Sequence, residues 1–229
     1  MQAALDETRA LLMEGLADWG IEASAARIDQ FLAYRDLLIE WNATRMNLTR
    51  IVAPREIAAE HFLDSISILT ALDLPQGASL LDIGAGAGFP SLPLKIVRPD
   101  LNVTLLEATA KKLTFCQSVC ETLGLRHVRL IHGRAEIHPD ILFARTFDLV
   151  TARAVAPLSR LLPWCDSYRH PDRGVIAALK GARAEEEVTQ ARPVLRQLGL
   201  TAEIRPVAIP GSDRTHAIVL CRRRAAPVV

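Results

Sequence analysis

The stretch LLDIGAGAGFP, residues 80–90, decides the fold of this chain. Its apolar run ends at Asp82, and glycines follow at the alternate positions Gly84, Gly86 and Gly88. A strand, a tight turn and the start of a helix have this order of residues, because glycine accepts turn conformations and has no Cβ to hold a ligand away from the backbone. The turn is therefore the first candidate for a ligand site.

Short β-rich runs alternate with helical patterns from residue 79 onward. The predicted strands are 80–83, 102–106, 127–131, 147–151, 174–179, 202–206 and 217–221, and the predicted helices are 92–97, 110–123, 157–168 and 185–197. This alternation is typical of an α/β fold with a mostly parallel, seven-stranded sheet, helices on both faces and a ligand crevice at the carboxyl ends of the strands. No helical pattern separates the last two runs, which predicts a C-terminal antiparallel hairpin.

The residues before the first strand have a helical pattern over most of their length. Apolar residues recur at three- and four-residue steps in 5–19 and in 28–39, and Pro54 begins a further pattern of this kind that runs to residue 69. The segment 42–49 interrupts the pattern. We therefore predict two parts, an N-terminal helical cap over residues 1–75 and an α/β domain over residues 76–229.

Composition restricts the class of protein. Half of the 229 residues are hydrophobic and the formal net charge is +1, so the chain can form a sizeable core but has no overall field that attracts a polyanion. The cysteines lack CxxC spacing and lie in apolar segments, which favours reduced, buried thiols over disulfides or a metal site; they are Cys116, Cys120, Cys165 and Cys221. Early acidic residues and the lack of a long uncharged apolar run favour a cytoplasmic protein without a secretory signal or membrane span.

Three segments together indicate a nucleoside-type ligand. The GxGxG spacing differs from the GxGxxG of dinucleotide folds, and no Lys-Ser or Lys-Thr follows the glycines as in a phosphate-binding loop. Glu107 ends the second predicted strand, where a carboxylate can accept hydrogen bonds from both ribose hydroxyls. After the third strand, residues 133–136 offer a backbone amide and a side-chain acceptor for an adenine edge. Taken singly, the turn is also compatible with strand–helix packing alone, and Glu107 with an ordinary strand-end acid.

The run Asp82–Gly88, with Glu107 after the second strand, resembles the S-adenosylmethionine site of class I methyltransferases. Over most of its length the chain also resembles the bacterial family of 16S ribosomal RNA (guanine-N7) methyltransferases, which is also called glucose-inhibited division protein B. The shared motifs are Trp41-Asn42 with Asn47-Leu48-Thr49, HFLDS at 61–65, GAGAGFPSLPLKIVRP at 84–99, Leu105-Leu106-Glu107 with Lys111-Lys112, Arg153-Ala154 and Leu179-Lys180-Gly181. Ser91 departs from the glycine expected in this family, and the segment between Trp41 and Asn47 is one residue longer than expected.

This resemblance implies a Rossmann-like methyltransferase domain over residues 76–229 and S-adenosylmethionine as the cofactor. The implied cofactor contacts are Gly84, Phe89, Ala135, Glu136 and Arg153, with Glu107 on the ribose and with Gly86 and Gly88 completing the cofactor turn. The candidate substrate contacts are Arg153, Lys180 and Arg134. A guanidinium at Arg153 suits the cofactor carboxylate or guanine O6, and an ammonium at Lys180 suits an RNA phosphate.

The implied partner is 16S ribosomal RNA or the small ribosomal subunit, and the chain is expected to act as a monomer without a metal or a membrane. Within the cap, His61 and Asp64 lie one helical turn apart, and we expect a hydrogen bond between them that anchors the cap rather than a catalytic role.

The implied chemistry requires no acid–base pair, so no catalytic residue is assigned. Guanine N7 carries a free lone pair at neutral pH, and methyl transfer from a sulfonium is an in-line displacement that depends on positioning. Thr151–Ala154 replaces the Asn-Pro-Pro-Tyr-like tetrad of enzymes that alkylate exocyclic amines, and Cys165 lies in a predicted helix rather than at a nucleophile position. Two alternatives remain open: a methyltransferase that acts on a small molecule or a protein, and an oxidoreductase or nucleotide-binding module that uses NAD.

Overall fold

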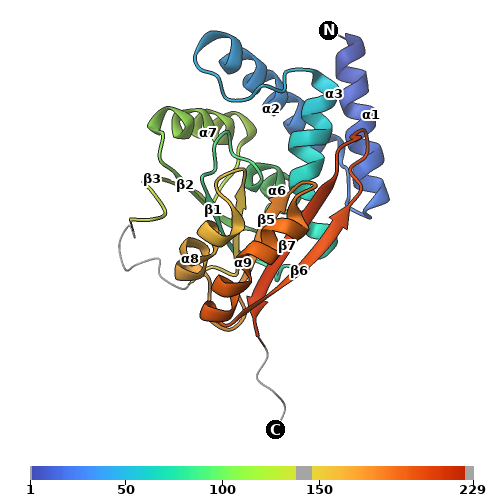
Figure 1. The fold of residues 1–229 in the computed structure, drawn as a ribbon. Helices are drawn as coiled ribbons and strands as arrows, with labels where there is room; N and C mark the ends of the chain where they lie inside the picture. Colours follow the sequence, from blue (N-terminus) through green and yellow to red (C-terminus); the bar gives the residue numbers. More distant parts are fainter. Residues whose placement is uncertain (1, 138–145, 225–229) are drawn as a thin grey trace.

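The computed structural model describes residues 2–137 and 146–224, with side chains from residue 7 onward. Within these residues seven strands form one sheet, in the order β3-β2-β1-β4-β5-β7-β6 (Figure 1). The strands are β1 (Ser79–Ile83), β2 (Asn102–Glu107), β3 (Val128–His132), β4 (Leu149–Arg153), β5 (Val175–Lys180), β6 (Leu200–Val207) and β7 (His216–Arg223). The first five pair in parallel, and β7 is antiparallel to both β5 and β6. The predicted α/β sheet with a C-terminal antiparallel hairpin is therefore confirmed.

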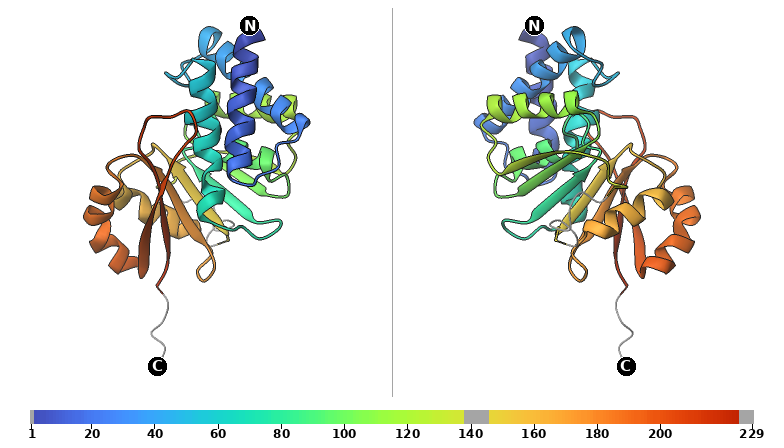
Figure 2. Two further views of the ribbon diagram at one scale, coloured as in Figure 1. Left: turned by 90° about the vertical axis from the view of Figure 1, so that its right-hand side faces the viewer. Right: turned by 90° about the vertical axis from the view of Figure 1, so that its left-hand side faces the viewer.

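Two layers of helices cover the sheet, one on each face (Figure 2). The cap, α6 (Ser91–Val97) and α7 (Ala110–Leu123) cover one face, whereas α8 (Leu158–Tyr168) and α9 (Ala184–Leu198) cover the other. Neighbouring residues on one strand belong to different cores because side chains alternate across a pleated sheet. Leu80 packs in the core beneath the cap, and Leu81 packs in the core beneath α8 and α9. The carboxyl ends of the parallel strands stay open to the site described below.

The cap consists of α1 (Gln2–Asp18), α2 (Ala25–Thr44) and a helical segment that begins at Pro54. The ring of Tyr34 stacks on that of Phe89 at 5.3 Å between centroids, so α2 lies directly on the segment that follows the glycine turn. Buried residues of the cap and of the sheet belong to one continuous apolar core. The predicted division of the chain into residues 1–75 and 76–229 stays a prediction.

Two features of the cap differ from the sequence-based prediction. α2 continues to Thr44, so the interruption expected from residue 42 begins three residues too early. The side chain of Asn42 explains the break that follows, because its Oδ1 accepts hydrogen bonds from the backbone amides of Leu48 at 2.7 Å and Thr49 at 3.0 Å. The expected third helix divides into α3 (Pro54–Glu56), the π-helical η1 (Ile57–Leu63), α4 (Asp64–Ile66) and α5 (Ile68–Ala71).

All cysteines are free and buried, as expected from their apolar surroundings. Burial raises the pKa of Cys120 to about 11 and that of Cys221 to about 12, so these thiols are neutral at physiological pH. Among residues 2–137 and 146–224 there is no group of three or more His, Cys, Asp or Glu side chains that could hold a metal ion. In the same residues, every helix is too short or too polar to span a membrane.

Candidate cofactor and substrate site

The glycine turn follows β1 directly and has left-handed backbone geometry. Gly84, Gly86 and Gly88 have φ angles of +68°, +59° and +85°, which side-chain-bearing residues adopt only at a cost. Two of the three positions also lack room for a side chain. A Cβ on Gly84 would lie 2.7 Å from Cγ2 of Val155, and one on Gly88 would lie 2.5 Å from Cδ1 of Leu92. The turn therefore requires glycine for both backbone shape and close packing.

Glu107 ends β2 and connects this strand to the glycine turn. Its Oε2 accepts a hydrogen bond from the Gly86 amide, and its Oε1 accepts one from the Thr109 amide, both at 2.9 Å. The residue is only 6% exposed, yet its carboxylate lines the hollow above the turn. A carboxylate oxygen accepts two hydrogen bonds, so each oxygen keeps capacity for a hydroxyl donor. Glu107 thus both holds the turn and faces a ligand in the hollow.

A first hollow of about 330 Å³ lies at the carboxyl ends of β1, β2, β3 and β4. Its walls are Ile83, Gly84, Leu106, Glu107, Ala108, Lys112, Gly133, Arg134, Ala135, Glu136, Ala154, Val155, Ala156, Arg160 and Trp164. The volume is that of a small-molecule site, and its walls combine apolar side chains with a carboxylate and exposed backbone. These donors and acceptors fit a nucleoside, with hydroxyls on Glu107 and a base edge near Ala135 and Glu136.

A second hollow of about 510 Å³ adjoins the first and shares the wall Ala154–Ala156 with it. It lies between the ends of β4 and β5, the cap and the turn before β7. Its walls are Glu60, Asp64, Arg153, Ala154, Val155, Ala156, Pro157, Leu179, Lys180, Gly181, Arg183, Glu187, Arg214, Thr215 and His216. Charges of both signs line both hollows, but the glycine turn and Glu107 belong to the first alone.

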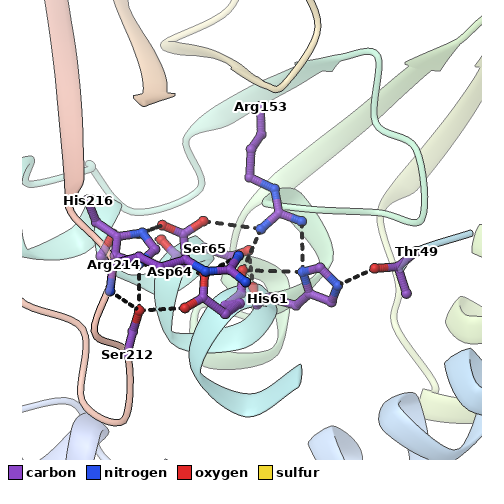
Figure 3. A network of polar contacts seen from close by, with 10 residues as sticks. Thr49, His61, Asp64, Ser65, Arg153, Ser212, Arg214 and His216 are labelled. Atoms are coloured by element: carbon purple, nitrogen blue, oxygen red, sulfur yellow. Dashed lines mark hydrogen bonds and ion pairs between the residues drawn. The ribbon is translucent and has the colours of Figure 1, made fainter. Parts of the chain in front are cut away.

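Arg153, at the end of β4, ties the sheet to the cap (Figure 3). One terminal nitrogen donates to the carbonyl of Glu60 at 2.9 Å and to Oδ2 of Asp64 at 3.1 Å. The other lies 3.3 Å from Nδ1 of His61. His61 and Asp64 are thus joined through the guanidinium, so the direct hydrogen bond expected between them is replaced by a bridge. The guanidinium also lies over the Phe89 ring, at 4.9 Å from the centroid.

The environment of His61 keeps its imidazole neutral. Burial first, and then the Arg153 charge, lower its pKa to about 3. Nδ1 lies 3.3 Å from the Arg153 guanidinium and 3.2 Å from the Glu60 carbonyl, and Nε2 lies 2.9 Å from Oγ1 of Thr49. The ring stacks on Phe89 at 4.6 Å between centroids. His61 is therefore a structural link in the cap.

The turn between β6 and β7 closes the network from the other side (Figure 3). Nδ1 of His216 lies 2.9 Å from Oδ1 of Asp64, and the hydrogen bond between them raises the pKa of His216. Ser212 donates to Oε1 of Glu60, and Arg214 donates to its Oε2 at 3.2 Å. Three parts of the chain that are distant in sequence therefore meet around two cap carboxylates.

The predicted cofactor residues fall into three groups in the structure. Gly84, Glu107, Ala135 and Glu136 line the first hollow, and Arg153 lines the second. Gly86, Gly88 and Phe89 form the turn and its support; Phe89 is 5% exposed and stacks between Tyr34 and His61. Their contacts with a cofactor stay predictions.

The predicted substrate residues are also separated. Arg134 lies at the first hollow, whereas Lys180 lies at the second with Arg153. Lys180 Nζ donates to Oε2 of Glu187 at 2.7 Å and to the Ala156 carbonyl at 3.1 Å, so an acidic partner already occupies it. The contact of Lys180 with an RNA phosphate stays a prediction.

The family model described as "GidB: rRNA small subunit methyltransferase G" matches residues 27–210 of this chain. The chain belongs to this family. A protein named ribosomal RNA small subunit methyltransferase G from Thermoanaerobacter sp. (strain X514) is 41% identical over 215 residues, which cover 93% of this chain and 89% of the relative. The protein of the same name from Lactococcus lactis subsp. cremoris (strain MG1363) is 42% identical over 219 residues, covering 94% of this chain and 91% of the relative.

Solved structures share the fold of this GidB family member at low sequence identity. A precorrin-6y C5,15-methyltransferase from Geobacter metallireducens has a TM-score of 0.56 at 20% identity, covering 71% of this chain and 88% of that one. A SAM-dependent methyltransferase from Aquifex aeolicus has a TM-score of 0.55 at 20% identity, covering 73% of this chain and 93% of that one. Identity this low shows the fold alone, that of class I methyltransferases.

Sequence reasoning about this GidB protein missed several acidic and basic residues of the second hollow, namely Glu60, Arg183, Glu187, Arg214 and His216. Glu60 precedes the HFLDS motif, Glu187 lies in the first turn of α9, and His216 begins β7. The family match ends at residue 210, before His216. An acidic residue early in a helix is common for electrostatic reasons alone, so no local signal separates Glu187 from Glu185 and Glu186.

Proposed function

We propose that this chain transfers a methyl group from S-adenosylmethionine to N7 of a guanine in 16S ribosomal RNA. The observation that carries the proposal is the first hollow, where Glu107 and the glycine turn meet at the carboxyl ends of β1 and β2. The names of the relatives support a small-subunit RNA as the substrate. Guanine and N7 are what the resemblance to the guanine-N7 methyltransferase family implies, which the HFLDS and GAGAGFPSLPLKIVRP motifs carry. We further propose that the protein acts as a cytoplasmic monomer.

The residues of the first hollow would bind the nucleoside part of the cofactor. Glu107 would accept the ribose hydroxyls while its hydrogen bond to Gly86 keeps the turn in place. The backbone of Ala135 and Glu136 would meet the adenine, and Trp164 supplies an apolar wall. When bound, S-adenosylmethionine supplies an electrophilic methyl group on a sulfonium.

The protein's part in the reaction is orientation and electrostatic support. N7 needs no deprotonation, so the chain has only to hold the base in line and exclude water. Positive charge moves onto guanine during the transfer, and Glu187 lines the adjoining hollow where the base would lie. Fixed carboxylates near a developing cation stabilise the transition state because they need no reorganisation.

The substrate assignment is tested by incubation of the protein with methyl-labelled cofactor and small-subunit RNA that lacks the modification. Reduction and aniline treatment then cleave the RNA at 7-methylguanosine. We expect one labelled cleavage site. Label in a protein or a small molecule, with no cleavage of RNA, would favour the first alternative and contradict the proposal.

The cofactor assignment is tested by calorimetry. S-adenosylhomocysteine is expected to bind, and NAD is not. Glu107→Ala removes the acceptor that faces the hollow and frees the amides of Gly86 and Thr109, so affinity for S-adenosylhomocysteine should fall at least tenfold, the scale of one hydrogen bond to a charged group. Equal affinity of the variant and the wild type, or tight binding of NAD, would overturn the assignment.

A further inference from the structure

The second hollow has the position that a methyl acceptor needs. It meets the first hollow along Ala154–Ala156, so groups bound in the two hollows would be neighbours across this segment. Ala154 has a left-handed φ of +55°, an unusual geometry for a residue with a Cβ, and Val155 is 38% exposed. Strained backbone often marks a site that function constrains. An apolar side chain between two hollows can also stack on a flat base.

The carboxylates of this hollow differ in how much hydrogen-bonding capacity they retain. Both oxygens of Glu60 are engaged, by Ser212 and Arg214, and both oxygens of Asp64 are engaged, by His216 and Arg153. The side chains of Glu60 and Asp64 are each 10% exposed. These two carboxylates therefore serve the cap network.

Glu187 is arranged differently. Among the described residues both of its hydrogen bonds end on Oε2, one from Lys180 at 2.7 Å and one from the Leu158 amide at 2.9 Å. No described residue donates to Oε1, and the side chain is 20% exposed, twice the value for Glu60 or Asp64. Glu187 lines the second hollow and is not part of the first. It thus presents a held, accessible acceptor.

Guanine carries a hydrogen-bond donor that an acceptor in the second hollow could meet. Its N7 and O6 lie on one edge, and its 2-amino group lies on the opposite edge. If N7 points toward the first hollow, the 2-amino group points toward the wall that belongs to the second hollow alone. A carboxylate there would favour guanine over bases that present no donor at this position.

We propose that Glu187 is a specificity-determining residue whose Oε1 accepts a hydrogen bond from the 2-amino group of the target guanine. This inference rests on the proposed function and assigns the base to the second hollow. Lys180 is a positioning residue in this arrangement, because its bond to Oε2 holds the carboxylate and leaves Oε1 for the base. The Leu158 amide, at the start of α8, holds the same oxygen from a second direction.

The test compares two RNA substrates that differ only in the 2-amino group. The guanosine located by aniline cleavage is replaced by inosine in an otherwise identical RNA, and methyl incorporation at that nucleotide is measured by mass spectrometry as kcat/KM. The wild type should prefer guanosine by about tenfold or more, the ratio expected for one hydrogen bond to a charged group. Glu187→Ala should react with both RNAs at nearly equal rates, and Glu187→Gln should have an intermediate preference.

A neighbouring residue provides the control. Glu186 lies in the same first turn of α9 but hydrogen-bonds Gln190 at an exposed position, so Glu186→Gln should keep the wild-type preference. Affinity for S-adenosylhomocysteine should be unchanged in every variant, which verifies that each one is folded. A full guanosine preference in Glu187→Ala, or equal rates for the two RNAs in the wild type, would overturn the role of Glu187 while leaving the proposed function intact. Cofactor binding without label at N7 in either RNA would instead overturn the proposed function, and this inference with it.

Discussion

Replacement of Asp82 by asparagine should make the stability of the protein less dependent on pH. Asp82 lies in β1 with no solvent exposure, and its Oδ2 accepts a long hydrogen bond, 3.3 Å, from the Ser91 amide. Oδ1 has no hydrogen-bond partner in the described part of the chain. Burial is the main cause that raises the pKa of Asp82 from 3.8 to about 8, and Ser91 opposes the rise. The folded protein therefore holds a neutral carboxylic acid here at pH 7.

The size of the effect follows from the two pKa values. Between pH 4 and pH 8 the folded state binds a proton at Asp82 that the unfolded state has released, so rising pH favours unfolding. The slope from one such group is about 1.4 kcal/mol per pH unit. From pH 5 to pH 7 the wild type should lose about 2–3 kcal/mol of unfolding free energy through this group alone. Asp82→Asn has a neutral side chain at every pH and should not share this loss.

Urea unfolding followed by circular dichroism, at pH 5, 6, 7, 8 and 9 for both proteins, measures this difference. Subtraction removes the contribution of all other titrating groups that the substitution leaves unchanged. We expect the unfolding free energy of the variant, relative to that of the wild type, to rise by about 2–3 kcal/mol between pH 5 and pH 7. Above pH 8 this difference should stay constant. Parallel curves over this range would refute the reasoning, because they would show that Asp82 is ionised in the folded protein.

Two further predictions concern the turn and the cap network. Gly84→Ala should lower the unfolding free energy by about 1–2 kcal/mol from its left-handed φ, and by more from overlap with Val155. Gly133 lines the same hollow, and a Cβ there would have its nearest contact at 3.5 Å, so Gly133→Ala should change the unfolding free energy by less than about 0.5 kcal/mol. Equal losses of unfolding free energy in the two variants, measured by urea unfolding, would contradict this account. His216 has a raised pKa through Asp64, so its stabilising contribution is present at low pH and is lost as pH rises through the folded pKa. The difference in unfolding free energy between the wild type and His216→Gln, measured by urea unfolding, should therefore be larger at pH 6 than at pH 9. The same difference at both pH values would count against the ion pair of His216 with Asp64.

The sheet was largely predictable because its signals are local. All seven strands lie within two residues of the predicted ranges, and α7 begins and ends at the predicted residues. The π-helical segment Ile57–Leu63 was not predicted, since a change of hydrogen-bond partner by one residue hardly alters the spacing of apolar side chains. The break after α2 depends on the side chain of Asn42, which accepts hydrogen bonds from the following loop. Such bonds do not change the spacing of apolar residues in the sequence, so the pattern does not show them.

The site also has a part that the sequence predicts and a part that it does not. The glycine turn and Glu107 are predictable because a strand, a turn and the next strand place them together within one βαβ unit. The pair Asp64 and His216 is separated by 152 residues, and only the order of strands across the sheet brings the two together. The role of Glu187 was equally hidden, because its significance depends on which oxygen Lys180 occupies.

The position of β7 has a consequence for how the protein is made. β7 lies between β5 and β6 in the sheet, although it follows both in the sequence. A growing chain therefore exposes β6 before the strand that pairs with it exists, and an unpaired strand edge invites association with other chains. The same late strand begins with His216, the partner of Asp64. A nascent chain arrested near residue 210 would thus have an open sheet edge and an incomplete cap junction, and both would be closed together once β7, His216–Arg223, has been made.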